Sequence, residues 1–446
     1  MAAPESARPS PIGSVHPGPA HPFGVAHRAF FGVYGLLWRA AAPLLGRNKR
    51  LREGLDQRLL REPLPPADLW VQAASVGEAF LAEELLRRLP TAVSGPLSVL
   101  VTTYTSQGFD ILEKAAASAA REAGSEVTVH VRYFPFDRPA LMRAALAQVR
   151  PRAAVLLETE IWPGFLLACR ESFVPVLLVN GRMRPRSLSG YLTWPSLFRA
   201  LAPVLVLTVS KADGARYGLI FGDERVEVMP NIKFDRLRSP APGDNPLAPL
   251  LPENARFLVL GSVRKEEEET VLSMLAAVRA EHPDVITGLF PRHMHRLDAW
   301  KGLLDGANIP WELRSRTKGP AAPGSVLLWD AFGEMLPAYG LARAAFVGGS
   351  LAPLGGQNFL EPLACGTPTV IGPSWDNFAW VGEEIVDTGL LTRCEDEQTA
   401  AATLANMLRK TPDRKKLAAA MARYVGERTG GAEMACARIA ERLNND

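Results

Sequence analysis

The chain has 446 residues, of which 47% are hydrophobic and 22% are charged, and its formal net charge is +3. This composition is that of an ordinary globular protein, and the length allows two domains with a core each. The small net charge gives no reason to expect a nucleic-acid partner. The four cysteines lie far apart without a CxxC pair, so neither a zinc site nor a disulfide framework is predicted.

The N-terminal part combines a polar head with an apolar segment. Residues 1–27 are rich in Pro, Ala, Gly and Ser and lack periodicity, so we predict a disordered head. The apolar stretch that follows is interrupted by Arg39 and Pro43, whereas spanning a bilayer takes about 20 apolar residues. Because basic residues flank it, we predict a membrane-associated anchor helix over residues 28–50 that lies in the interface. The alternative is a helix that packs on the protein itself.

Two series of short apolar strands alternate with helical patterns, in residues 51–238 and 255–446. This alternation predicts parallel sheets with helices on both faces. The Pro-rich residues 239–254 are typical of a linker. We therefore expect an α/β architecture of two Rossmann-like domains that face a cleft, with ligands at the carboxyl ends of the strands. The predicted strands are Leu69–Ala73, Leu97–Thr102, Val127–Tyr133, Ala153–Leu157, Val176–Val179, Leu205–Val209, Arg256–Gly261, Val285–Phe290, Val326–Leu328, Ala344–Val347 and Thr369–Ile371.

The first polar constellation follows the first of these strands. Ser75 and Gly77 lie in a turn, and Glu78 stands at the start of a helix. We expect the helix dipole and the free backbone N–H groups to keep this carboxylate ionised. An ionised carboxylate can remove a proton from an attacking hydroxyl, an effect typically worth about 10²–10⁴-fold in rate. The alternative, which is commoner for such glutamates, is that Glu78 only stabilises its helix.

The second constellation follows the strand that ends at Leu157. Alternation places Glu158 and Glu160 on one face, where they can share a proton, bind a metal or pair with a cation such as Arg182. The chain contains no Asp-x-Asp pair, a common metal-binding motif, so we favour a metal-free site. Lys233 precedes the predicted linker, and its cation can offset the charge of a leaving phosphate.

Two more groups lie in the second half of the chain. Arg264 and Arg292 both follow predicted strands, so both can reach a phosphate. Residues 266–269 are four glutamates that we interpret as a charged first helical turn rather than a metal site. The neighbouring candidates are Ser262, Pro291, Phe332, Gly333 and Glu334.

Residues 346–373 form the most informative stretch of the chain. An apolar strand meets two glycine pairs, a helix with Glu361 near its start, and a second apolar strand. Glycines let the backbone approach a phosphate, and the N–H groups of a helix start point at it. Glu361 can accept hydrogen bonds from a ribose diol. The stretch favours a nucleotide-binding turn over an ordinary strand-turn-helix corner, with the candidates Gly349, Ser350, Asn358, Phe359, Leu360 and Glu361.

Taken together, these stretches resemble the Kdo (3-deoxy-D-manno-octulosonic acid) transferases, from about residue 28 to the C-terminus. Several ordered motifs carry the resemblance, and GPSWDNF does so more loosely than the others. The motifs are ASVGE (74–78), ETEIWP (158–163), NIKFD (231–235), PRH (291–293), VGGSLAPLGGQNFLEP (347–362) and GPSWDNF (372–378).

The resemblance implies a GT-B glycosyltransferase that needs no metal and no cofactor. The implied reaction is inverting transfer of Kdo from CMP-Kdo to a lipid A precursor (lipid IVA) in lipopolysaccharide core biosynthesis. The implied location is the cytoplasmic face of the cell inner membrane, among its lipids. Glu78 would be the general base, and Glu158 and Lys233 would stabilise the transition state. The implied CMP contacts are Pro291, Arg292, Phe332, Gly333, Glu334, Asn358, Phe359, Leu360 and Glu361.

Three features depart from the family pattern. Gln72 stands where many members have His, Pro230 stands where Gly is common, and the head is extra. Two alternatives were weighed: another GT-B nucleotide-sugar transferase, and a non-catalytic lipid-binding protein on the same scaffold. The presence of Glu78, Glu158 and Lys233 together speaks against both.

Overall fold

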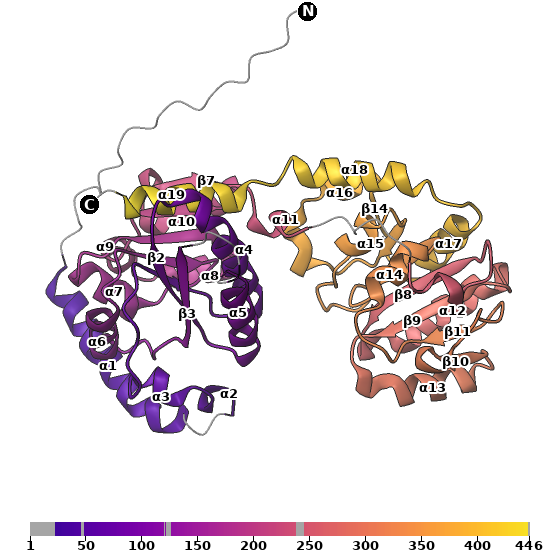
Figure 1. Ribbon diagram of the computed structural model, residues 1–446, viewed down its shortest axis with the longest axis horizontal. Helices are drawn as coiled ribbons and strands as arrows, with labels where there is room; N and C mark the ends of the chain where they lie inside the picture. The colour runs from indigo at the N-terminus through magenta and orange to yellow at the C-terminus, as the bar shows by residue number, and fades with distance from the viewer. Residues whose placement is uncertain (1–22, 46–48, 120, 122–125, 238–244, 445–446) are drawn as a thin grey trace, which may run out of the picture. The chain divides into compact units, whose positions relative to one another are not determined.

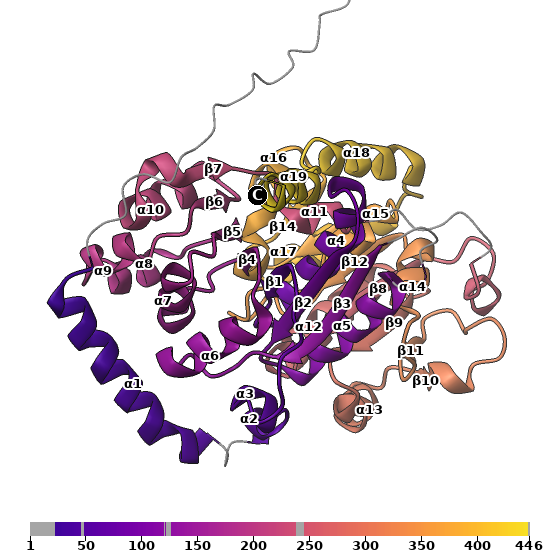
Figure 2. The ribbon, with the colours of Figure 1, turned by 60° about the vertical axis from the view of Figure 1, so that its left-hand side comes forward.

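The computed structural model describes residues 23–45, 49–119, 121, 126–237 and 245–444. These residues belong to two compact units (Figures 1 and 2). Unit 1 comprises Met1–Asp235 together with Gly430–Asp446, and unit 2 comprises Arg236–Thr429.

Unit 1 is built on a seven-stranded parallel sheet, which confirms the predicted class. The strand order is β3-β2-β1-β4-β5-β6-β7. The central strands are apolar on both faces, as expected for a sheet that is covered by helices on both sides. The strands are β1 Leu69–Gln72, β2 Leu97–Thr103, β3 Val127–Tyr133, β4 Ala153–Leu157, β5 Val176–Gly181, β6 Leu205–Thr208 and β7 Val226–Val228.

Helices cover both faces of this sheet. Leu69 and Val71 pack with α4, α5 and α19 on one face, while Trp70 packs with α1, α6 and α7 on the other (Figure 1). The helices of unit 1 are α1 Val25–Leu45, α2 Lys49–Arg52, α3 Leu55–Arg58, α4 Val76–Ala92, α5 Ser106–Ala119, α6 Pro139–Val149, α7 Pro163–Glu171, α8 Pro185–Tyr191, α9 Pro195–Ala200, α10 Lys211–Phe221, α11 Ile232–Asp235 and α19 Gly431–Leu443.

Unit 2 repeats the plan with a second parallel sheet in the order β10-β11-β9-β8-β12-β13-β14. Leu258 and Leu260 face α12, α13 and α17, while Phe257 and Val259 face α14. The strands are β8 Phe257–Val263, β9 Ile286–Pro291, β10 Trp311–Leu313, β11 Val326–Leu328, β12 Ala344–Val347, β13 Thr369–Ile371 and β14 Leu391–Arg393. The helices are α12 Glu268–Glu281, α13 Leu297–Gly306, α14 Met335–Leu341, α15 Leu360–Ala364, α16 Glu384–Asp387, α17 Glu397–Leu408 and α18 Arg414–Gly426.

Two domain boundaries differ from those expected. The C-terminal helix α19, expected in the second domain, packs in unit 1, where Ile439 and Leu443 join the core formed by α4. Residues 245–254, expected in the linker, belong to unit 2, because Leu247 and Leu250 are buried in its core. Both segments are anchored by side-chain burial, which outweighs the Pro-rich composition of the second. Residues 238–244 lie outside the described residues.

The N-terminal helix α1 begins earlier than expected and packs on the rest of unit 1. It begins at Val25, so residues 25–27 of the predicted disordered head are helical, while residues 1–22 lie outside the described residues. Phe31 is buried, the Tyr34 hydroxyl donates to Asp137 at 2.8 Å, and Trp38 stacks on Phe136. None of the helices in the described residues is long and apolar enough to cross a membrane.

Candidate active site

The polar residues of interest gather where the strand order reverses in each sheet. In unit 1 the reversal lies between β1 and β4, which run parallel with Gln72 opposite Leu156. Ala74 and Glu158 both lie two residues beyond that pair, so they stand next to each other at the carboxyl edge. In unit 2 the reversal lies between β8 and β12. Crevices at such points are the usual ligand sites of doubly wound sheets.

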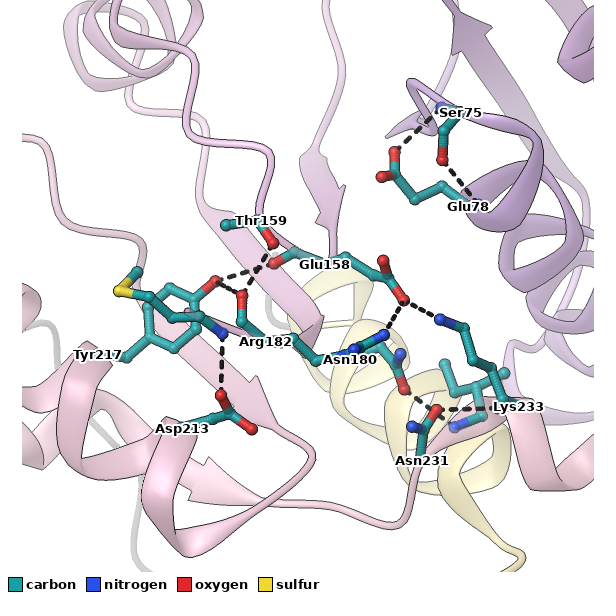
Figure 3. A network of polar contacts seen from close by, with 12 residues as sticks. Ser75, Glu78, Glu158, Thr159, Asn180, Arg182, Asp213, Tyr217, Asn231 and Lys233 are labelled. Carbon is teal, nitrogen blue, oxygen red and sulfur yellow. Dashed lines mark hydrogen bonds and ion pairs between the residues drawn. The ribbon is translucent and has the colours of Figure 1, made fainter. Parts of the chain in front are cut away.

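Glu78 is held in its loop by backbone N–H groups. It is the third residue of α4, and the Ser75 hydroxyl accepts a hydrogen bond from the Glu78 N–H at 3.3 Å. In return Glu78 Oε2 accepts from the N–H groups of Ala74 (2.6 Å) and Ser75 (3.3 Å; Figure 3). The S-x-x-E spacing of residues 75–78 is therefore a capping box, a signal that the sequence already contained. Within the described residues, Glu78 Oε1 has no hydrogen-bond donor.

The expectation that Glu78 stays ionised is wrong. Burial and, after it, the charges of Glu160 and Glu158 raise its pKa to about 8, although the N–H groups of Ala74 and Ser75 act in the opposite direction. Desolvation and two like charges therefore outweigh the helix start. A carboxyl group with this pKa is largely protonated at neutral pH, and its ionised form is a stronger base than that of an ordinary glutamate.

Glu158, by contrast, is paired with two cations. Lys233 Nζ lies 2.6 Å from Glu158 Oε1, and Arg182 Nη1 lies 3.7 Å from the same oxygen (Figure 3). The backbone of Glu158 has a φ of 53°, a left-handed conformation that is costly for a residue other than glycine. The Tyr217 hydroxyl donates to the Glu158 carbonyl at 3.0 Å and helps to hold this turn. Of the three options open in the sequence, pairing with a cation is the one that Glu158 adopts.

Two buried asparagines, which the sequence reasoning missed, hold the short helix α11 that carries Lys233. Asn180 Oδ1 accepts from the Ile232 N–H at 2.9 Å, and Asn231 Oδ1 accepts from the Lys233 N–H at 3.0 Å (Figure 3). On the other side of α11, Asp235 accepts from the Gly430 N–H at 2.7 Å. No local pattern marks Asn180, because its partner lies 52 residues further along the chain.

In unit 2 the glycine turn after β12 holds a carboxylate of the protein itself. Buried Glu267 accepts hydrogen bonds from the N–H groups of Gly349 and Arg264 (2.9 Å for the latter). The N–H groups of Ser350 and Leu351 also lower its pKa, but burial raises it more. The turn that the sequence suggested for a phosphate is therefore filled by Glu267, and Ser350 is fully buried with its hydroxyl donating to the Val347 carbonyl.

The other nucleotide-site candidates of unit 2 divide into exposed and committed residues. Arg292 and Phe332 are exposed, and the pKa of nearby His293 is lowered by desolvation and by the charges of Arg292 and Arg264. Glu334 accepts from Arg314 Nη2 and from Trp329 Nε1, each at 2.9 Å.

The stretch from Asn358 to Glu361 presents one polar pair. Asn358 Nδ2 donates to Glu361 Oε1 at 2.8 Å, and burial raises the pKa of Glu361. Phe359 and Leu360 are buried in the core, so any contact they make with a ligand must come from their backbone. Pro291 is likewise buried, as the last residue of β9.

The remaining candidates are two turn residues and Glu160. Gly77 lies in the first turn of α4, and Ser262 is the second-last residue of β8, with a φ of 57°. Glu160 accepts from Trp162 Nε1 at 2.5 Å. A search of the described residues found no group of three His, Cys, Asp or Glu side chains placed to hold a metal ion.

Comparison with known proteins identifies the family of the chain. A family model described as 3-deoxy-D-manno-octulosonic-acid transferase (kdotransferase) matches residues 48–236. The chain is 32% identical over 420 residues to the 3-deoxy-D-manno-octulosonic acid transferase of Bordetella pertussis, covering 90% of this chain and 96% of that protein. It is 28% identical over 332 residues to the enzyme of the same name from Haemophilus influenzae, covering 72% of this chain and 74% of that protein.

A solved structure extends the comparison to the fold. A glycosyltransferase from Rickettsia africae matches with a TM-score of 0.55 and 12% identity, covering 86% of this chain and all of that one. This likeness bears on the fold alone, and with the two parallel sheets it identifies a two-domain α/β fold of the GT-B type. Because the Bordetella pertussis relative is aligned over nearly its whole length, the chain belongs to the 3-deoxy-D-manno-octulosonic acid transferase family and is a glycosyltransferase.

Proposed function

We propose that the protein transfers Kdo from CMP-Kdo to a lipid A precursor, lipid IVA, in lipopolysaccharide core biosynthesis, with inversion and without a metal ion. The observation that carries the proposal is the Lys233–Glu158 pair at the switch point of unit 1, where the Glu78 loop also lies. This edge offers a base and a cation at one place, which is what displacement of a phosphate by a hydroxyl requires.

In the proposed reaction, Glu78 Oε1 takes the proton of the acceptor hydroxyl. The hydroxyl oxygen forms a bond to the anomeric carbon of Kdo, and the bond from that carbon to the CMP phosphate oxygen breaks. CMP leaves with the electron pair as an anion, while the sugar passes through a cation-like state. Glu158 and Lys233 stabilise these developing charges. Their mutual contact at 2.6 Å fixes both groups before substrate arrives.

Unit 2 is proposed to bind the CMP portion. Its exposed Arg292 is suited to a phosphate, and Glu361, fixed by Asn358, is suited to the ribose hydroxyls. The Gly349–Ser350 turn contributes shape rather than direct phosphate contacts, because Glu267 already uses the N–H of Gly349.

The test is incubation of the protein with CMP-Kdo and tetraacylated lipid A precursor, followed by mass spectrometry of the lipid. The wild type is expected to add the mass of Kdo, and Glu78→Gln is expected to lose about 10²–10⁴-fold in rate. Glu113→Gln, an exposed glutamate on α5, is the matched control and should keep full activity. Transfer by Glu78→Gln at the control rate would remove Glu78 as the base. Undiminished transfer in EDTA is expected, and its loss would contradict the metal-free mechanism.

The same proposal places the protein on the cytoplasmic face of the inner membrane through α1. The helix packs on unit 1 through Phe31, while Val33, Leu36 and Leu37 are 57%, 63% and 64% exposed. Such an apolar stripe with exposed Arg39 suits a helix lying in an anionic interface. Flotation with phosphatidylglycerol vesicles should recover the wild type, and a variant with Leu36→Glu and Leu37→Glu should stay behind. Equal flotation of both would contradict this placement.

A further inference from the structure

The second glutamate of the sequence ETE, Glu160, has no role in the reaction proposed above, yet it occupies the same edge of unit 1. It follows the left-handed turn at Glu158, and its N–H donates to the Leu157 carbonyl at 3.3 Å. Its carboxylate is engaged by a neutral donor, the indole N–H of Trp162. Glu158, only two residues away, is engaged by Lys233 and Arg182 instead.

A series of direct contacts connects Glu160 to the loop that holds Glu78. The Trp162 ring stacks on the Tyr104 ring, with centroids 5.0 Å apart and planes 29° from parallel. The Tyr104 N–H donates to the Ala74 carbonyl at 3.3 Å, and the Ala74 N–H binds the Glu78 carboxylate. Because these groups directly follow the carboxyl ends of β1, β2 and β4, which are neighbours in the sheet, the two carboxylates are held at the same edge.

The two acidic neighbours of Glu78 differ in how far nearby cations compensate their charges. The charge of Glu158 is largely offset by Lys233 and Arg182, whereas Glu160 meets a neutral indole. Of the two like charges that act on Glu78, that of Glu160 is accordingly the larger. Glu160 is itself held with a raised pKa of about 7 by burial and by Glu158, with the Trp162 N–H acting against them. The other titratable groups that its charge reaches are the buried hydroxyls of Tyr104, Tyr191 and Tyr217.

We propose that Glu160 is a positioning residue for the transfer reaction: clamped by Trp162, it acts through its negative charge to make Glu78 a stronger base. The inference rests on the proposed function, because it needs Glu78 to accept the proton of the acceptor. A carboxylate of ordinary strength is a poor acceptor for a hydroxyl proton, and a like charge nearby increases its affinity for that proton. The pair then holds about one proton between them near neutral pH and titrates as a unit.

The test is the pH profile of kcat/KM for Glu160→Gln. Removal of the neighbouring charge lowers the pKa of Glu78, so the acidic limb is expected to move to lower pH by roughly one unit. The plateau should fall several-fold because the base is weaker. Glu160→Asp retains the charge and should keep the limb near the wild-type position. Glu113→Gln should leave both limb and plateau unchanged.

A Glu160→Gln profile with the wild-type acidic limb would overturn the inference. Should turnover be too slow to measure, the carboxyl carbon of Glu78 in ¹³C-glutamate-labelled protein reports its pKa directly. A value equal to that of the wild type would overturn the inference as well. If instead the proposed role of Glu78 as the base were wrong, Glu78→Gln would transfer Kdo at the full rate, irrespective of the residue at position 160.

Discussion

Glu78 in unit 1 and Glu267 in unit 2 occupy matching places in two similar sheets. Each follows the strand at the switch point, β1 or β8, and each returns its carboxylate to backbone N–H groups of its own loop. Burial raises the pKa of both. The two glutamates differ in the loop that follows the neighbouring strand. The loop after β12 donates the Gly349 N–H to Glu267, whereas the loop after β4 places the like charges of Glu158 and Glu160 near Glu78.

This difference shows how one plan yields a structural and a reactive carboxylate. Glu267 is 1% exposed and therefore nearly inaccessible to solvent. The loops around it are tightly packed, because a Cβ atom added to Gly348 would lie 2.8 Å from the Ser262 carbonyl oxygen. Its hydrogen bonds join the β8 and β12 loops. Glu78 uses one oxygen for its loop, while the other oxygen, the proposed proton acceptor, lies in a setting of like charges. Donors from a neighbouring loop stabilise the anion, and acidic side chains from a neighbouring loop strengthen the base.

Glu267→Ala should give the largest change in stability. It leaves the N–H groups of Arg264 and Gly349 buried without an acceptor, and each such loss costs about 1–3 kcal/mol. We expect the free energy of unfolding to fall by about 4 kcal/mol, measured as a lower urea midpoint and unfolding temperature. Glu266→Ala, an exposed neighbour, is the control and should change stability by less than about 0.5 kcal/mol. Equal stability of the two variants would break the comparison.

Lys233→Met should show the opposite profile, with activity lost and stability kept. The ammonium group offsets charge at the reacting centre, so kcat is expected to fall by about 10²–10³-fold. The Lys233 and Glu158 side chains are 21% and 17% exposed, but Arg182 still lies 3.7 Å from Glu158 Oε1, so the unfolding temperature should fall much less than for Glu267→Ala. Lys211→Met, an exposed lysine on α10, is the control in the same transfer assay. A variant that unfolds early and transfers normally would assign Lys233 a structural role.

The pH dependence of the free energy of unfolding tests the raised pKa of Glu78. Its folded-state pKa of about 8 lies above the unfolded value, so its contribution to stability is present below the unfolded pKa and is lost as pH rises through 8. Glu78→Gln removes this loss. Unfolding temperatures measured at pH 5, 6.5 and 8 should therefore show that the stability of the variant relative to the wild type increases as the pH rises. A constant difference between the two proteins would mean that Glu78 titrates as an ordinary glutamate.

A third buried carboxylate, Asp137, offers the smallest test. It accepts from the N–H groups of Gly164 and Phe165 and from the Tyr34 hydroxyl, and burial raises its pKa to about 7. Tyr34→Phe removes the one donor that comes from α1 and should cost about 1 kcal/mol. Faster amide hydrogen exchange in α1, with unchanged exchange in α7, is the expected observation. Unchanged exchange in α1 would show that aromatic packing alone holds this helix.

The strands that the sequence analysis missed all lie at sheet edges, whereas of the predicted strands only β3 does. Apolar runs such as Ala153–Leu157 are long enough to identify a buried strand. The missed strands β7, β10 and β14 each end a sheet, and each contains a charged residue that interrupts the apolar run, whereas the equally short β11 and β13 were recognised because they are fully buried. The position of polar residues just after strands was enough to bring Glu78 and Glu158 to one edge.

What the sequence could not provide was the long-range environment of these residues. The expected ionised state of Glu78 failed because its burial and the charge of Glu160 depend on a loop some 80 positions away. The glycine turn favoured a phosphate because nothing local shows that Glu267 fills it. The resemblance assigned roles to Glu78, Glu158 and Lys233, and these assignments stay predictions until variants are assayed.

The packing of α19 has a consequence for how the chain folds during synthesis. Unit 2 is one continuous segment inserted within unit 1, and α19 supplies Ile439 and Leu443 to the core beside α4. The ribosome therefore releases all of unit 2 before unit 1 has its last core helix. Unit 2 can fold as it emerges, while the core of the unit that carries Glu78 stays incomplete until α19 has been synthesised, with Leu85 and Leu89 on α4 uncovered by α19 until then.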